Sequence, residues 1–148
     1  MGNYSHAEGQ DTKAGYLKED GTSAGTGAHA EGSGTHAKGS YSHAEGFKTK
    51  ANTTCGHAEG CETIANALYS HTEGYHTYAG SNYQHVQGKF NKKDNAGKYV
   101  HIVGWGDGDE DSKRKDIHTL DTSGNAVYSG KVTAGSRATE NMDLVTLI

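Results

Sequence analysis

One short phrase, Ser42-His43-Ala44-Glu45-Gly46, returns along this chain at a fixed interval and decides its fold. Related copies occupy positions 28–32, 56–60, 70–74 and 84–88, the last with the sequence Gln-His-Val-Gln-Gly. Their histidines follow one another every 14 residues, at His29, His43, His57, His71 and His85. A fixed period of this kind indicates stacked structural units, one for each repeat.

Each repeat also holds a second, shorter phrase of the form Thr-X-Ala, which begins at Thr35, Thr49, Thr63 and Thr77. A helix is a poor interpretation of this pattern, because each glycine inside a helix costs about 1 kcal/mol relative to alanine. Short strands broken by glycine turns fit better, and successive coils of two strands then rise by about 4.7 Å. We therefore expect an all-β chain that forms a parallel β-roll, a solenoid of about six coils and about 28 Å in length.

The register has one interruption near the N-terminus. A first copy of the phrase places His6 23 residues before His29 instead of 14. We expect the additional residues at about 16–24, where the sequence Lys-Glu-Asp-Gly is typical of an exposed turn. The roll, with this insert, is expected to cover residues 1–88.

The composition is unusual for a globular domain, because 22 of the 148 residues are glycine, none is proline and 32% are hydrophobic. A core of Ala, Ser and Thr is weak, so we expect oligomerisation to contribute to stability. The net charge of −4 gives no reason to expect a nucleic-acid partner. The sequence shows no apolar run long enough to span a bilayer and no secretion leader at Met1, so we expect no membrane insertion.

Alternation along a strand predicts which side chains face the interior of a coil. In the phrase His-Ala-Glu the alanine points inward, while the histidine and the glutamate point outward. Two outward rows of aromatic residues accompany them, and rings on successive coils are expected to stack. The first row holds Tyr41, Tyr69 and Tyr83, and the second holds Phe47 and Tyr75.

The period ends after Gly88, and the remaining sequence is of a different kind. Residues 89–97 are expected to be a polar connector. Within residues 98–135, three short strand-like segments are separated by a charged loop and a turn, which predicts a small antiparallel β cap over the open end of the roll. Residues 136–148 are expected to be a tail or the start of a further segment, with a helix capped by Thr139.

The repeats resemble those of two families. The 14-residue period is similar to the head repeats of trimeric autotransporter adhesins, which carry Ser-Val-Ala-Ile-Gly where this chain has Ser-His-Ala-Glu-Gly. A closer resemblance is to tail-fibre and minor structural proteins of phages and prophages of Gram-positive bacteria. Those proteins carry Ser-His-Ala-Glu-Gly repeats, followed by segments like residues 83–91, 98–104 and 118–126 of this chain. The resemblance implies a left-handed roll in an intertwined or side-by-side homotrimer.

The outward histidines and glutamates are the main candidate site. In a trimer we expect them to pair across the seam between protomers, because each group then satisfies the hydrogen bonding of the other. The residues concerned are His29, Glu31, His43, Glu45, His57, Glu59, His71, Glu73, His85 and Gln87. The alternative is a ring of three histidines on the trimer axis that binds Zn²⁺ or Ni²⁺. We favour pairing, and expect no resident metal and no cofactor.

Two further sets of residues are given a structural interpretation. Asp107, Asp109 and Asp111 alternate as in a calcium loop, but Ser112 and His118 stand where such a loop has glycine and glutamate, so an exposed hairpin tip is expected. The cysteines, Cys55 and Cys61, fall in the aromatic rows and are interpreted as small apolar substitutes.

We expect no catalytic residues, because a repeated serine or histidine cannot specify one activated nucleophile. The expected function is that of a structural component of a phage or prophage tail fibre or baseplate, both a rigid trimeric spacer and a binder of the host surface. Its expected partners are two further copies of the chain, other tail proteins and a glycan or protein on the host cell. The expected location is the virion, after synthesis in the host cytoplasm without a secretion signal. The alternative is the head fragment of a bacterial trimeric surface adhesin.

Overall fold

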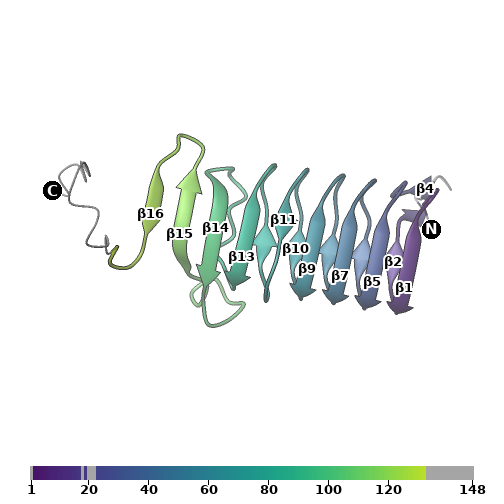
Figure 1. Ribbon diagram of the computed structural model, residues 1–148, viewed down its shortest axis with the longest axis horizontal. Helices are drawn as coiled ribbons and strands as arrows, with labels where there is room; N and C mark the ends of the chain where they lie inside the picture. The colour runs from purple at the N-terminus through teal and green to yellow at the C-terminus, as the bar shows by residue number, and fades with distance from the viewer. Residues whose placement is uncertain (1, 18, 20–22, 133–148) are drawn as a thin grey trace, which may run out of the picture.

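The computed structural model describes residues 2–17, 19 and 23–132, and within them every regular element is a strand (Figure 1). The strands are β1 (His6–Gln10), β2 (Lys13–Ala14), β3 (Tyr16–Leu17), β4 (Ser23–Ala24), β5 (His29–Ser33), β6 (His36–Ala37), β7 (His43–Phe47), β8 (Lys50–Ala51), β9 (His57–Cys61), β10 (Ile64–Ala65), β11 (His71–Thr72), β12 (Tyr78–Ala79), β13 (His85–Lys89), β14 (Tyr99–Trp105), β15 (Asp116–Asp121) and β16 (Ala126–Tyr128). The expected tail at 136–148, with its helix, and the end of the expected cap at 133–135 lie outside the described residues.

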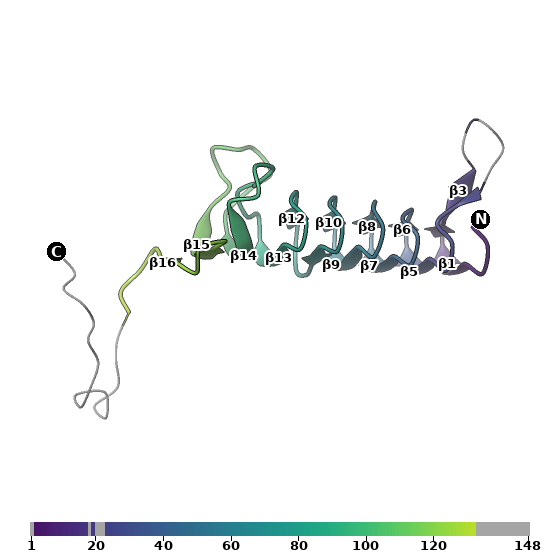
Figure 2. The same ribbon diagram turned by 90° about the horizontal axis from the view of Figure 1, so that it is seen from above.

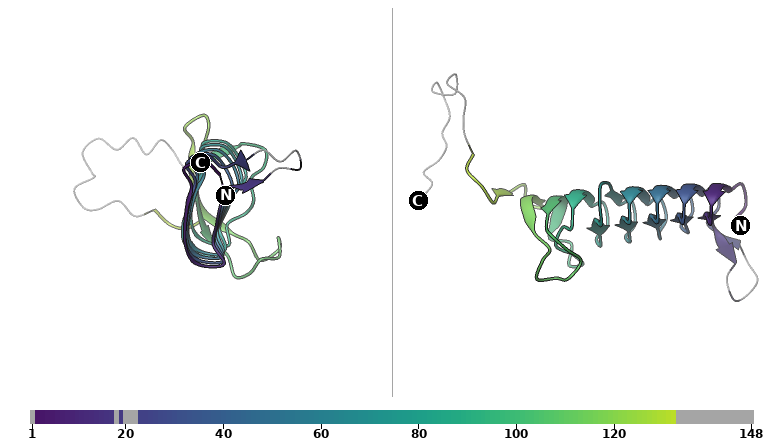
Figure 3. Two further views of the ribbon diagram at one scale, coloured as in Figure 1. Left: turned by 90° about the vertical axis from the view of Figure 1, so that its right-hand side faces the viewer. Right: turned by 90° about the horizontal axis from the view of Figure 1, so that it is seen from below.

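Most strands belong to a parallel β-solenoid. Its long sheet has the order β1-β5-β7-β9-β11-β13-β14-β15-β16, and its short sheet has the order β12-β10-β8-β6-β2. Equivalent residues of successive repeats are paired, as His43 is with His57. Viewed along the axis, the coils superimpose on one flattened loop (Figure 3). The expected all-β roll of about six coils, with about 14 residues in each turn, is confirmed. Its left-handedness and its trimeric state stay predictions.

The insert expected at about 16–24 contains a pair of short strands. β3 and β4 are antiparallel, with Tyr16 opposite Ala24, and they project from the N-terminal end of the roll (Figure 2). The coil before the insert keeps its register, because β1 pairs with β5 and His6 lies opposite His29. The insert therefore leaves the stacking of the coils intact.

The interior of the roll is filled by small side chains, as the alternation predicted. The fully buried alanines of the two sheets are Ala14, Ala30, Ala37, Ala44, Ala51, Ala58, Ala65 and Ala79. Along the long sheet the row then enlarges through Thr72 and Val86 to Ile102, and all three have an exposed fraction of 0%. Val86 and Ile102 lie beyond the last strand of the short sheet, where larger side chains are needed to fill the interior.

Each coil turns at two corners where the backbone has a positive φ. The residues at these corners are Tyr4, Gly27, Tyr41, Cys55, Tyr69 and Tyr83 on one side, and Asp11, Gly34, Lys48, Glu62, His76 and Phe90 on the other. Glycine therefore turns the chain in one coil only, and the glycine of the repeated phrase is not at a corner. Gly60 instead lies in the long strand with a φ of +100°, and a Cβ there would lie 2.3 Å from the carbonyl oxygen of Gly74. This glycine permits close approach of neighbouring coils.

The long sheet continues one strand further than the period indicated. We expected residues 98–104 to belong to an antiparallel cap, but β14 pairs in parallel with β13, placing His101 opposite His85 and Gly104 opposite Gly88. The two histidines are 16 residues apart instead of 14, and the longer spacing hid the match. β15 and β16 then add to the sheet in antiparallel orientation, as expected for the cap.

A buried side chain, Asn91, ends the short sheet. Its Oδ1 accepts a hydrogen bond from the Tyr78 N–H at 2.8 Å, and its Nδ2 donates to the carbonyls of Tyr78 at 3.0 Å and Lys92 at 2.7 Å. In the preceding coil the equivalent N–H, that of Ile64, donates to the backbone carbonyl of Thr77 at 2.9 Å. The Asn91 amide therefore takes the place of a backbone peptide where no further strand follows.

The charged loop between β14 and β15 is anchored to the roll by Arg114. This side chain, 5% exposed, lies 2.6 Å from the Asp109 carboxylate and donates to the carbonyls of Asn91 at 2.9 Å and His76 at 3.2 Å. The Nδ1 atom of His76 also lies 2.8 Å from Asp109. Asp109 therefore anchors the loop through Arg114 and His76.

Replacing Gly60 with alanine is expected to destabilise the roll, because the added Cβ would meet the Gly74 carbonyl at a φ that L residues rarely adopt. We expect the free energy of unfolding, measured by urea denaturation, to fall by about 2 kcal/mol or more. Gly130→Ala is the matched control, since nothing lies within 4 Å of a Cβ at Gly130. Equal losses in the two variants would contradict the role assigned to Gly60.

Asn91→Ala is expected to lower the free energy of unfolding by about 2–3 kcal/mol, because it leaves backbone groups of Tyr78 unsatisfied in a buried position. The same urea measurement on Asn95→Ala supplies the control, since Asn95 is exposed. An unchanged midpoint for Asn91→Ala would show that water replaces the amide without cost.

Candidate functional site

The long sheet carries a continuous column of stacked imidazole rings. His29, His43, His57, His71 and His85 follow one another with ring centroids 4.5–4.8 Å apart and interplanar angles of 2–14°. The column continues from His85 through His101 and His118 to Tyr128, with separations of 5.2, 5.3 and 4.5 Å. Parallel in-register pairing explains the stacking, because it repeats each side chain at the spacing of neighbouring strands.

A row of carboxylates runs beside the imidazoles, and most rings have a carboxylate oxygen near Nε2. The pairs are His6–Glu8 (3.5 Å), His29–Glu31 (3.9 Å), His43–Glu45 (3.8 Å), His71–Glu59 (3.3 Å) and His85–Glu73 (3.3 Å). Gln87, in the position of a glutamate, has its Nε2 3.3 Å from Nε2 of His101. The structure thus brings the predicted partners together within one chain, whereas pairing across a trimer seam stays a prediction.

Burial lowers the pKa of His43, His57 and His101 below the ordinary value for imidazole, and positive charge on neighbouring histidines lowers it further. Nearby glutamates oppose this change in pKa without reversing it. Burial raises the pKa of Glu59, but interaction with the Glu45 carboxyl group, the hydrogen bond from His71 and the charges of His57 and His71 outweigh burial and lower it overall. At neutral pH we therefore expect neutral rings at these positions, beside ionised carboxylates.

A groove with a glycine floor follows the carboxylate row. Its lining consists of Glu31, Gly32, Glu45, Gly46, Glu59, Gly60, Glu73 and Gly74. Because the glycines have no side chains, the backbone of four successive coils is accessible along the groove. The repeated phrase therefore builds an extended acidic surface instead of an enclosed pocket.

The first expected aromatic row lies at the exposed corners of the coils. Tyr69 and Tyr83 stack with ring centroids 5.1 Å apart, in agreement with the expected ladder. Tyr41 is on the same row, but Cys55 occupies the coil between it and Tyr69. Cys55 is a free, exposed thiol.

The second expected row is not a stack of rings. Cys61 lies between Phe47 and Tyr75 in the sheet, so the two rings are not on adjacent coils. Tyr75 instead packs edge-on against His76 and Phe90, with centroids 4.4 and 5.1 Å away. Cys61 is also a free thiol.

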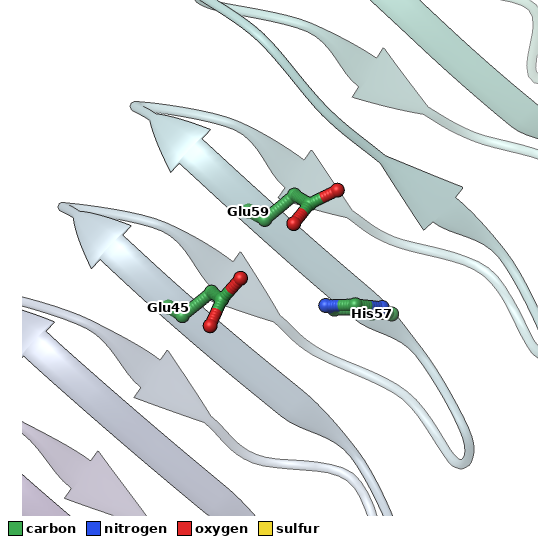
Figure 4. Close-up of side chains that lie close together, drawn as sticks. All are labelled: Glu45, His57 and Glu59. Atoms are coloured by element: carbon green, nitrogen blue, oxygen red, sulfur yellow. The ribbon is translucent and has the colours of Figure 1, made fainter.

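One part of the long sheet brings three ligating side chains together. Glu45 extends from β7, and His57 and Glu59 extend from β9, with one ring nitrogen of His57 turned toward the two carboxylates (Figure 4). One donor atom from each residue lies within 4.8 Å of the other two. The sequence placed all three in one set, but could not distinguish them from their equivalents in other coils.

Sequence reasoning missed the continuation of the column into the cap. His101 and His118 were outside the predicted set, although His101-Ile-Val-Gly104 repeats the form of His85-Val-Gln-Gly88. A search that tolerated two additional residues would have found His101. His118 comes from an antiparallel strand, so the period carries no information about it.

The chain matches no family model, no curated protein and no solved structure. The part of the chain that the structure describes contains no helix that could span a bilayer.

The histidine column predicts a loss of stability in mild acid. The pKa values of His43, His57 and His101 are lower in the folded chain than in the unfolded chain, so the unfolded state binds more protons as pH falls through about 6.5. We expect the melting temperature, measured in EDTA, to be constant above pH 7 and to fall by several degrees, about 1 kcal/mol of stability, by pH 5.5.

The double variant His43→Phe, His101→Phe is the comparison, because phenylalanine retains a stacking ring but does not titrate. Its melting temperature should fall less between pH 7 and 5.5 than that of the original chain. A flat profile for the original chain from pH 8 to 5 would show that the column does not control stability.

Proposed function

We propose that this chain is a non-enzymatic structural segment of a phage or prophage tail fibre or baseplate appendage, a homotrimeric spacer that also contacts the host surface. The observation that supports this proposal best is the unbroken parallel pairing from β1 to β14, which joins all the coils in one rod (Figure 1). A rod of this kind is a suitable spacer, because each coil is hydrogen-bonded to the next and the two ends are therefore held at a fixed separation.

The need for assembly follows from the core. Alanine is the main buried apolar side chain of the roll, and each alanine buries little area compared with leucine or phenylalanine. Large side chains other than the corner tyrosines also remain exposed on the surface, among them Phe47 and Tyr75. Contact between copies would bury such area and compensate for the thin interior.

A binding role for the same rod rests on the exposed corner tyrosines. Tyr41, Tyr69 and Tyr83 expose half or more of their surface, at 67%, 50% and 69%. Exposed tyrosines are enriched at recognition surfaces, because the ring provides apolar area and the hydroxyl provides a hydrogen bond. A glycan or protein of the host surface is the proposed ligand of this row.

Sedimentation equilibrium of the whole chain tests the proposed assembly. We expect a single species with three times the 15.6 kDa mass of one chain. A monomer at micromolar concentration would overturn the proposed trimer.

A charge-reversal variant then tests the proposed seam. Glu31→Lys combined with Glu73→Lys should shift the mass toward that of the monomer, because both residues lie on the long sheet face. Glu110→Lys in the exposed loop is the matched control and should leave the trimer intact. If the double variant remains a trimer, the seam lies on another face.

A further inference from the structure

We propose that Glu45, His57 and Glu59 form a binding site for one divalent transition-metal ion, of which Zn²⁺ is the best match, between two adjacent coils of a single chain. The site goes beyond the proposed function, because one chain supplies all three ligands and the trimer is not needed. It also differs from the ring of three histidines considered from the sequence, because it does not lie on an axis between protomers.

The geometry distinguishes His57 from its two neighbours in the column. Within the described residues, His57 has no carboxylate oxygen within the 4.0 Å of an ion pair, whereas the nearest column neighbours on either side do, at 3.8 Å for His43 and 3.3 Å for His71. The donor atoms of Glu45, His57 and Glu59 nevertheless lie within 4.8 Å of one another. The three groups face a common point without closing on it (Figure 4).

A second observation concerns the ring nitrogen itself. Nε2 of His57 is shielded from solvent and has no hydrogen-bond partner; the same is true of His43 and His85, but each of those rings has a carboxylate oxygen within 4.0 Å, at 3.8 and 3.3 Å. A shielded nitrogen without a partner costs free energy, and a metal ion bound to its lone pair would remove that cost. The pKa of His57 is lowered, first by burial, which favours the neutral ring, and a neutral imidazole offers one nitrogen lone pair to a metal ion.

Neighbouring histidines of the column hold two of the three ligands, His57 and Glu59, in a fixed orientation. The His57 ring is held between His43 and His71, at centroid distances of 4.8 and 4.5 Å and angles of 4° and 2°, so its orientation is fixed by stacking. Glu59 is oriented by His71, whose Nε2 lies 3.3 Å from Oε1 of Glu59, and this leaves the second oxygen for an ion. Partners that orient the ligands in this way raise the affinity of metal sites.

The donor set selects the class of ion. One imidazole nitrogen and two carboxylates suit Zn²⁺, which binds these ligands at about 2.0–2.2 Å and commonly takes water as its fourth ligand. The corresponding donor-to-donor distance is about 3.4 Å, so donor atoms within 4.8 Å of one another must approach by up to about 1.4 Å, which rotation of the glutamate side chains allows. Ca²⁺ and Mg²⁺ prefer sites made wholly of oxygen and should bind more weakly.

Isothermal titration calorimetry with ZnCl₂ on the whole chain, cleared of metal with EDTA and dialysed, tests the proposal. We expect one tight site for each chain, and binding of CaCl₂ at least about tenfold weaker. His57→Phe keeps a stacking ring and should weaken Zn²⁺ binding at least about tenfold, as should Glu59→Gln. His6→Phe and Glu8→Gln, at the exposed first coil of the same two rows, are the matched controls and should bind as the original chain does.

Three results would overturn the site: no tight Zn²⁺ binding, unchanged binding by His57→Phe, or losses in Glu8→Gln as large as those in Glu59→Gln. The last result would indicate a diffuse attraction of cations to the whole acidic row. Long-range ¹H–¹⁵N spectra of the imidazoles in the unmodified chain provide a readout that needs no variant. Zn²⁺ should shift Nε2 of His57 most, and a larger shift at another histidine would contradict the assignment.

Discussion

The structure depends on one constraint: backbone hydrogen bonds hold each coil in register with the next. The N–H of His43 donates to the carbonyl of Gly56 at 2.9 Å, and the N–H of His57 donates to that of Ser70 at the same distance. Coils joined in this way lie about 4.8 Å apart. At that spacing the strand glycines must remain glycine, and the interior between the two sheets is filled mainly by small side chains, alanine and threonine above all.

The same constraint makes the ends of the roll its weakest points, because a parallel sheet that stops exposes unpaired backbone groups. At the C-terminal end the two sheets stop in different ways. The long sheet passes into an antiparallel hairpin, while the short sheet ends on the side chain of Asn91. Arg114 joins the hairpin loop to that end. The side chains of Asn91 and Arg114 thus make hydrogen bonds to backbone groups that a further coil would otherwise have paired.

In-register stacking also repeats each outward side chain along the rod. Whether neighbouring copies of a side chain attract or repel one another depends on the chemistry of that side chain. Imidazole rings gain by stacking when they are neutral, and the lowered pKa values of His43, His57 and His101 favour that state. Carboxylates at the same spacing repel one another unless a cation or a partner lies nearby. The proposed contact between copies and the proposed metal site would both reduce this repulsion. The first would act along the whole row of carboxylates, and the second at one pair of coils.

The sequence by itself determined the repeat, the inward alanines and the outward His and Glu rows, because a 14-residue period and strand alternation are local properties of the chain. The tertiary structure alone decided where the roll ends, since the pairing of His101 with His85 tolerates two additional residues. It also decided that the glycine of the repeated phrase allows close stacking, while most corners are taken by tyrosine, lysine and other residues. Finally, it separated Glu45, His57 and Glu59 from their equivalents, because side-chain rotation, which no period records, left Nε2 of His57 with neither a hydrogen-bond partner nor a carboxylate oxygen in ion-pair range, whereas the equally shielded Nε2 atoms of His43 and His85 have such an oxygen.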